Sequence, residues 1–302
     1  MQEDLRTWLS PPDSSINHNH ACKTHHDGTA TWFIHSTKFR EWKNNGSLLW
    51  INGNRTLVPL ALRDCTLIPS PIPQPALEKA YFGTRYHQHS CDTQFMSLIS
   101  SAIIGDIKNV QEETSVLVVY HYFDFKDASK RHVRGLLASL LSQLSDNSDH
   151  CLDTLCHLYK TCCDGNEQPS DSALAKCLKT MIGLPGQLPI FVIMDALDEC
   201  PNTTGIPTAR EEVLDFVEDL IGSRYSNLFI CITSRPEQDI QIVLNPLTSA
   251  SCRVALHEEI GQREDIRHYV RSFVHTDRAM RRWKEEDKEL VIETLTERAS
   301  GM

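Results

Sequence analysis

The chain has 302 residues and a formal net charge of −10, with 40% hydrophobic and 23% charged residues. This composition is sufficient for a packed core, and the acidic balance argues against a general binder of nucleic acid or of anionic membranes. No apolar run approaches the roughly 20 residues that span a bilayer, and the first residues lack the apolar core of a signal peptide, so we expect a cytoplasmic protein without a membrane span.

Residues 1–45 form a polar, aromatic N-terminal extension. Trp32, Phe39 and Trp42 are spaced as one helical stripe, which predicts a face that packs against the segment that follows. The next residues, 47–51, are a short apolar run that enters Asn52-Gly53. This run predicts a buried strand that ends in a turn.

Residues 54–97 have neither the period of a helix nor that of a strand, and five of the chain's 14 prolines lie there. The tract predicts an irregular, Pro-rich insert. Because so long a structureless loop is improbable inside a compact domain, it is either a translated intron or a genuine insertion.

Regular periodicity returns after this tract and continues to the end of the chain. Apolar runs predict strands at 115–125, 188–194, 228–233 and 251–256, and helices are predicted at 98–108, 130–144, 149–161, 171–183, 209–221, 261–275 and 285–300. Continuous apolar strands separated by helices predict an α/β fold with a parallel sheet covered on both faces, over residues 46–260. The charged helices of residues 261–302 follow it.

Three acidic residues lie directly after the buried strand at 188–194, namely Asp195, Asp198 and Glu199. Ligands of parallel sheets bind beyond the carboxyl ends of the strands, and a carboxylate there can hold Mg²⁺ together with substrate phosphates. On this interpretation Asp195 is the metal ligand, and Asp198 or Glu199 orients or deprotonates water. An acidic turn exposed to solvent is the alternative.

A cation follows the next strand, where Ser234 and Arg235 come after the run 228–233. Arg235 is expected at the same edge as Asp195, where it either contacts a terminal phosphate or pairs with the acidic cluster. Thr233 or Ser234 is a candidate cap of the helix that follows.

Eleven cysteines are present, an odd number without regular spacing, and we expect reduced thiols. Two stretches, 150–163 and 18–26, combine cysteine with histidine. A metal site in either is a minor alternative to ordinary thiols and a solvated connector.

Several motifs make the resemblance to a known family specific. The run 189–200, Pro-Ile-Phe-Val-Ile-Met-Asp-Ala-Leu-Asp-Glu-Cys, resembles the Walker B segment of NACHT-family P-loop nucleoside triphosphatases, and Thr-Ser-Arg-Pro at 233–236 resembles that family's sensor 1. The segments 8–13, 25–28, 48–53, 120–125, 134–137 and 261–265 are similar to its fungal branch with a nephrocystin-3-like N-terminal region.

The resemblance implies a signal-transduction NTPase of the STAND type, in which exchange of ATP or GTP, bound with Mg²⁺, switches oligomerisation. Such fungal proteins usually carry repeats after the NTPase module. Self-association or other signalling proteins are the implied partners. It also implies that residues 261–302 begin a helical lid, which is truncated in this sequence.

The main difference between this sequence and that family lies in the phosphate-binding loop. Gly53 stands at the position of its first glycine, but five residues later stands Val58, and the chain contains no Gly-Lys dipeptide. Backbone amides and a lysine of this loop normally hold the phosphates. We therefore expect a degenerate or interrupted NTPase module, weak or inactive in nucleotide binding, with a non-catalytic interaction scaffold as the alternative.

Overall fold

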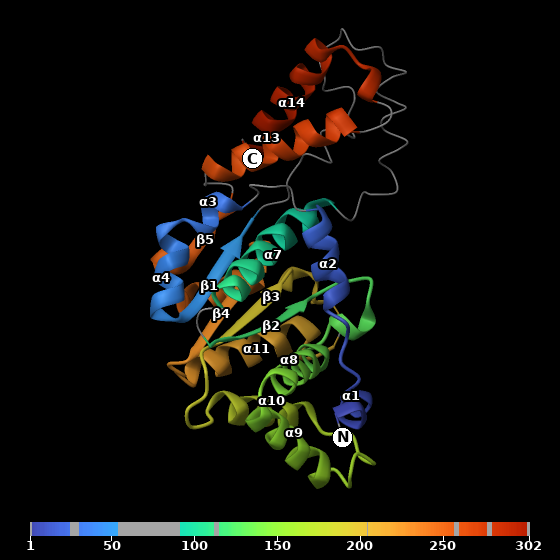
Figure 1. Ribbon diagram of the computed structural model, residues 1–302, viewed down its shortest axis with the longest axis vertical. Coiled ribbons are helices and arrows are strands. Elements are labelled where there is room, and N and C mark those ends of the chain that lie inside the picture. Colours follow the sequence, from blue (N-terminus) through green and yellow to red (C-terminus); the bar gives the residue numbers. More distant parts are fainter. Residues whose placement is uncertain are drawn as a thin grey trace.

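A five-stranded, entirely parallel sheet forms the centre of the molecule, which confirms the predicted α/β class (Figure 1). The computed structural model describes residues 2–24, 30–53, 91–111, 115–203, 205–256, 260–276 and 280–300. The strands are β1 (Ser47–Asn52), β2 (Leu117–Tyr122), β3 (Ile190–Asp195), β4 (Leu228–Ser234) and β5 (Arg253–Ala255), and their order across the sheet is β2-β3-β4-β1-β5.

The strand order creates a switch point between β1 and β4. From β1 the chain continues to β2 at the far edge, whereas from β4 it continues to β5 on the opposite side of β1. Neighbouring strands whose connections diverge in this way leave a crevice at their carboxyl ends, where ligands of open α/β sheets bind. Asn52 is in register with Ser234, and Tyr122 with Asp195, so the predicted site residues end at one edge.

Within the described part of the chain, six helices contribute to the core on one face of the sheet: α1 (Gln2–Leu9), α8 (Val133–Asn147), α9 (Asp149–Thr161), α10 (Asp171–Ile182), α11 (Ala209–Gly222) and α12 (Gln238–Leu247). The other face is covered by α3 (Thr31–Ile34), α4 (Thr37–Asn45) and α7 (Cys91–Gln111), and its apolar cluster continues into α13 (Ile260–Thr276) and α14 (Glu285–Ser300). Successive strand residues alternate between these two cores, as the pleat requires. Figure 1 shows α13 and α14 together at one end of the molecule, opposite α9.

The N-terminal extension is helical, as predicted, but its aromatic stripe is divided between two helices. α3 ends before Ser36, whose hydroxyl accepts a hydrogen bond from the amide of Phe39 and begins α4. Phe39 and Trp42 are fully buried against the sheet, where Trp42 meets the rings of Phe191 and Phe229. A serine cap thus interrupts a periodicity that a single helix would have continued.

Three further helix boundaries differ from the prediction. α7 begins at Cys91, so the part of the predicted insert from 91 to 97 is helical; residues 54–90 lie outside the described residues. α8 begins at Val133 and not at 130, because a short 3₁₀ helix, η2 (Ala128–Lys130), precedes it. The helix expected after Ser234, for which the sequence indicated no bounds, is α12; Glu237 stands at its N-cap, so neither Thr233 nor Ser234 caps it.

In the part of the chain that the structure describes, no helix is long and apolar enough to cross a membrane. Nine cysteines of these residues are free, namely Cys22, Cys151, Cys156, Cys162, Cys163, Cys177, Cys200, Cys231 and Cys252. The same residues contain no group of three histidine, cysteine, aspartate or glutamate side chains arranged to hold a metal ion, so the Cys/His stretches at 150–163 and, as far as it is described, 18–26 form no such site.

Candidate functional site

Asp195 lies at the carboxyl end of β3, and its carboxylate is fully enclosed by hydroxyl groups. Ser97 Oγ donates to Oδ2 at 2.5 Å, while Ser100 Oγ and Thr233 Oγ1 donate to Oδ1 at 2.5 and 2.7 Å. Burial raises the pKa of Asp195 above its ordinary value, and the three hydrogen bonds oppose that rise. The buried carboxylate predicted from the sequence is present, with α7 and β4 supplying its neutral partners.

Asp198 and Arg235 form an ion pair at the same edge. Arg235 Nε lies 3.2 Å from Asp198 Oδ2, and the backbone amide of Arg235 donates to Asp198 Oδ1 at 3.0 Å. The Asp198 side chain is 8% exposed and that of Arg235 is 28% exposed. Of the two roles that the sequence left open for Arg235, the structure therefore contains the pairing with the acidic cluster.

Glu199 lies apart from that pair and faces the end of β2. Its Oε2 accepts a hydrogen bond from the amide of Phe125 at 3.0 Å. Asp198 and Glu199 both belong to the short 3₁₀ helix η3 (Leu197–Glu199), which begins after Ala196 in the left-handed conformation, φ 56°. This sharp turn sends the two adjacent carboxylates to different neighbours, one toward β4 and one toward β2.

Ser234 and Gly53 contribute to the sheet edge through hydrogen bonds with one another and with a buried ring. The indole of Trp50 donates to Ser234 Oγ at 2.9 Å, and the amide of Gly53 donates to the Ser234 carbonyl at 3.3 Å. A Cβ on Gly53 would approach Met96 and Leu256 to 3.3 Å. Gly53 and Ser234, two of the three residues predicted to bind the cofactor together with Arg235, are thus close together, but their polar groups are engaged within the protein.

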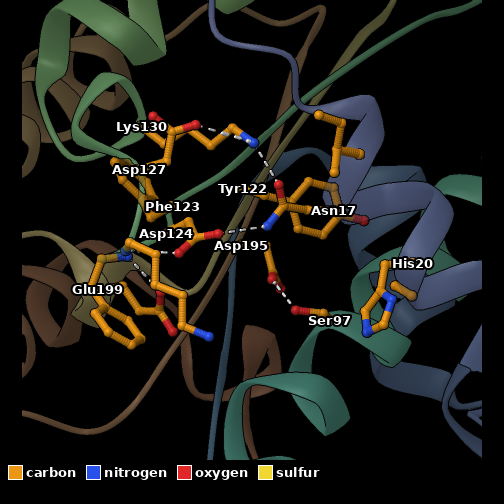
Figure 2. A pocket seen from close by; sticks show the side chains of 14 residues that line it. Asn17, His20, Ser97, Tyr122, Phe123, Asp124, Asp127, Lys130, Asp195 and Glu199 are labelled. Carbon is orange, nitrogen blue, oxygen red and sulfur yellow. Dashed lines mark hydrogen bonds and ion pairs between the residues drawn. The ribbon is translucent and has the colours of Figure 1, made fainter. Parts of the chain in front are cut away.

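A pocket of about 350 Å³ opens beside Asp195, at the carboxyl ends of β2 and β3 and against α2 (Ser15–Thr24) (Figure 2). Asp195 and Ser97 lie on one part of its wall, and Glu199 on another. Its other lining residues are Ile16, Asn17, His20, Ala21, Tyr122, Phe123, Asp124, Phe125, Lys126, Asp127 and Lys130. Arg235, Ser234 and Gly53 do not line it.

The sequence interpretation missed Ser97, Asn17 and Lys130. Ser97 was the last residue of the presumed insert, and only its place one turn before Ser100 on a helix would have indicated a hydroxyl facing the acidic strand end. Lys130 was read as the start of an amphipathic helix, and Asn17 belongs to a polar helix without an amphipathic pattern. Contacts between residues 98 and 113 positions apart join these side chains to the site.

The donor set at Asp195 is of the kind that magnesium takes. Mg²⁺ prefers oxygen ligands and is held by one or two carboxylates together with substrate phosphates, while P-loop enzymes pair an aspartate with a serine or threonine hydroxyl. Asp195 Oδ2 and Ser97 Oγ are such a pair, and both residues line the pocket. Residues 54–90, which follow Gly53 at the position of the family's phosphate loop, lie outside the described residues.

The raised pKa of Asp195 predicts that its replacement by asparagine increases the free energy of unfolding, and that this increase depends on pH. A folded-state pKa above that of the unfolded chain means that ionised Asp195 opposes folding at high pH, and that this cost disappears as the pH falls toward the unfolded pKa. We expect Asp195→Asn to be more stable than the natural protein by about 1 kcal/mol or more at pH 8, since neutral replacements of buried charges often stabilise. This advantage should shrink on acidification.

Urea unfolding of both proteins between pH 8 and pH 5 measures this difference. Asp153→Asn, which removes an exposed carboxylate from α9, reports the general effect of the charge change. A variant that is less stable than the natural protein at pH 8 would show that the three hydroxyl groups outweigh the burial of the charge.

Comparison with known proteins supports the family resemblance over part of the chain. Residues 96–235 match the family model described as nephrocystin 3, N-terminal. The matched segment contains β2, β3 and β4 and extends from Met96, next to Ser97, to Arg235. No curated protein and no solved structure shows significant similarity to the chain.

Proposed function

We propose that this chain is a NACHT-like signalling module of the STAND type whose remaining nucleotide site is a magnesium-polyphosphate pocket beside Asp195. The observation that carries the proposal is the pairing of Asp195 with the Ser97 hydroxyl at the wall of that pocket. The similarity of residues 96–235 to the nephrocystin 3 N-terminal family supports it. ATP or GTP is the proposed ligand, a fungal origin the proposed source, and the cytoplasm the proposed location.

The proposed roles of the acidic residues follow from their contacts. Asp195 and Ser97 would hold Mg²⁺, which supplies charge neutralisation for the phosphates when bound. Glu199 lines the pocket, so its carboxylate is the candidate to accept a proton from water. Asp198 is engaged with Arg235 and is proposed to position that arginine at the switch point. We propose weak binding, because no Gly-Lys phosphate loop is present in the sequence.

Binding of Mn²⁺, followed by electron paramagnetic resonance, tests the proposal directly. We expect the natural protein to bind the ion, Asp195→Asn to lose binding, and Ser97→Ala to weaken it about tenfold, the low end of the loss seen when metal-site partners are removed. Asp153→Asn is the control for a general loss of negative charge. Addition of ATP or GTP should tighten Mn²⁺ binding by the natural protein.

A non-catalytic interaction scaffold is the second candidate, and a specific observation favours it. The carboxylates at the strand ends already have partners within the protein: three hydroxyls at Asp195, Arg235 at Asp198 and the Phe125 amide at Glu199. Such a closed network satisfies the buried polar groups and makes the sheet edge rigid without a ligand. Mn²⁺ binding that is absent, or equal in the natural protein and Asp195→Asn, would decide for the scaffold.

A further inference from the structure

Lys130 places a buried ammonium group at the wall of the Asp195 pocket. Its side chain is 4% exposed, and its Nζ donates to Asn17 Oδ1 at 2.6 Å. The carboxylate of Asp127 is farther away, with Oδ2 at 3.7 Å. An ammonium has three N–H donors, and among the described residues these are its two oxygen partners. The group is therefore buried with part of its donor capacity unused, which costs free energy.

The loop that carries Lys130 is rigidly held. Asp127 accepts hydrogen bonds from the amide and hydroxyl of Ser129 and thereby begins η2. Asp124 accepts from the amide of Lys126, and Glu199 accepts from the amide of Phe125. Three of the carboxylates that line the pocket thus bind loop amides. They hold the loop in place, and Asp127 also forms an ion pair with Lys130, with its Oδ2 3.7 Å from Nζ.

Asn17 occupies the place that an anionic oxygen would take on Lys130. Its amide oxygen accepts from the lysine, while its nitrogen donates to Asp124 Oδ2 at 3.2 Å (Figure 2). A neutral amide thus bridges a cation and an anion from different segments. A phosphate oxygen would be a stronger acceptor for the ammonium than this amide, because it carries negative charge and adds a Coulombic attraction to the hydrogen bond.

The charges of the pocket decide which kind of phosphate it can take. Four carboxylates and two lysines line it, so a bare polyphosphate would meet a net negative wall. The four carboxylates are Asp124, Asp127, Asp195 and Glu199. A magnesium-bound polyphosphate carries less negative charge and presents the cation to Asp195 and Ser97. Neutralisation by the metal therefore has to precede or accompany phosphate binding.

We propose that the Lys130 ammonium binds the phosphate oxygens of a magnesium-bound polyphosphate in this pocket, displacing Asn17. The inference rests on the proposed function and names the cation for the phosphates in a chain that contains no Gly-Lys dipeptide. The lysine comes from the segment after β2 and not from the segment after β1. The proposed specificity is for the phosphate chain, because Lys130, Asp195 and Ser97 would contact the phosphates and the metal and not a nucleotide base.

Isothermal titration with inorganic tripolyphosphate, in the presence of Mg²⁺, tests Lys130. We expect Lys130→Met to weaken binding about 10- to 100-fold, as loss of one charge-assisted contact implies. Lys126→Met is the matched control, because Lys126 lines the same pocket but is exposed and lies over the ring of Phe125. It removes the same charge and should change binding less than threefold. Chelation of Mg²⁺ should abolish binding by the natural protein.

Two further measurements separate this inference from the proposed function. Lys130→Met should retain Mn²⁺ binding in the absence of phosphate, since the lysine does not contact Asp195 or Ser97. Asn17→Ala, which leaves the lysine in place, should bind tripolyphosphate as tightly as the natural protein or more tightly. ATP in place of tripolyphosphate should show the same dependence on Lys130, and a dependence confined to ATP would overturn a phosphate-specific contact.

The outcomes are distinct. Equal effects of Lys126→Met and Lys130→Met, or a loss of binding in Asn17→Ala, would overturn the role of Lys130 while Asp195-dependent Mn²⁺ binding kept the proposed function intact. Absence of any Asp195-dependent binding in the natural protein would overturn both.

Discussion

Replacing Arg210 by methionine is expected to lower the free energy of unfolding by about 3 kcal/mol, because two backbone carbonyls at the site lose a charged donor. Arg210 is 5% exposed and lies on α11. Its Nε donates to the Cys200 carbonyl at 2.9 Å, and its Nη2 donates to the Asp198 carbonyl at 2.6 Å. Its Nη1 completes the arrangement with an ion pair to Asp239 on α12 at 3.0 Å.

The effect should reach the site as well as the fold, since Arg210 holds the turn that follows β3. Urea unfolding gives the loss of stability, and the Mn²⁺ titration reports whether Asp195 remains competent. Arg253→Met is the matched control: Arg253 is exposed and its Nη1 contacts the Asn245 side chain. We expect it to cost less than about 0.5 kcal/mol, the usual range for surface substitutions. Equal losses in the two variants would refute the role of Arg210 in holding this turn.

The strands were predictable because each is a continuous apolar run buried on both faces, a pattern that needs no knowledge of the partners. For the same reason the sequence placed Asp195, Asp198 and Arg235 at strand ends that share one edge, and β3 and β4 are indeed neighbours. The sequence could not predict which of the neighbouring groups each of these side chains would contact. Arg235 pairs with Asp198 because the turn at Ala196 directs that carboxylate toward β4.

The remainder of the site could not be predicted because it depends on contacts between distant segments. Ser97 reaches Asp195 across 98 positions, and Asn17 reaches Lys130 across 113. The role of Arg210 cannot be seen in the local sequence, because its side chain donates to the backbone carbonyls of Asp198 and Cys200. Every residue type has such a carbonyl, so the identity of these partners gives no indication. Hydrophobic periodicity predicts which face of a helix or strand is buried. It does not predict which polar side chains meet at the end of a sheet.

The N-terminal extension takes part in the pocket wall and in the core. Through Asn17 and His18, α2 contacts Lys130, Asp124 and Tyr122 at the pocket wall. Farther along, the carboxylate of Asp265 on α13 accepts from the amide of Ala30 and the indole of Trp32, at 2.7 and 2.9 Å. Described parts of the extension thus contact both the pocket wall and helix α13.

Replacing Trp42 by alanine is expected to cost about 3–5 kcal/mol, the range for deleting a large aromatic side chain from a core. Trp42 is fully buried on α4, its indole donates to the Ser47 carbonyl at 3.2 Å, and its ring meets Phe39, Phe191 and Phe229 with centroid distances of 5.7, 5.6 and 6.4 Å. Edge-to-face contacts to strands β3 and β4 make this ring the link between extension and sheet.

Denaturant unfolding of Trp42→Ala, with Trp283→Ala as the matched control, measures this cost. Trp283 is only half-buried and packs at the margin of the same core, so its loss should be clearly smaller. Should Trp42→Ala fail to fold, Trp42→Phe retains most of the apolar contact and is expected to lose about 1–2 kcal/mol, within the range for reshaping a packed core. If Trp42→Ala cost less than Trp283→Ala, Trp42 would not be the link between the N-terminal extension and the sheet.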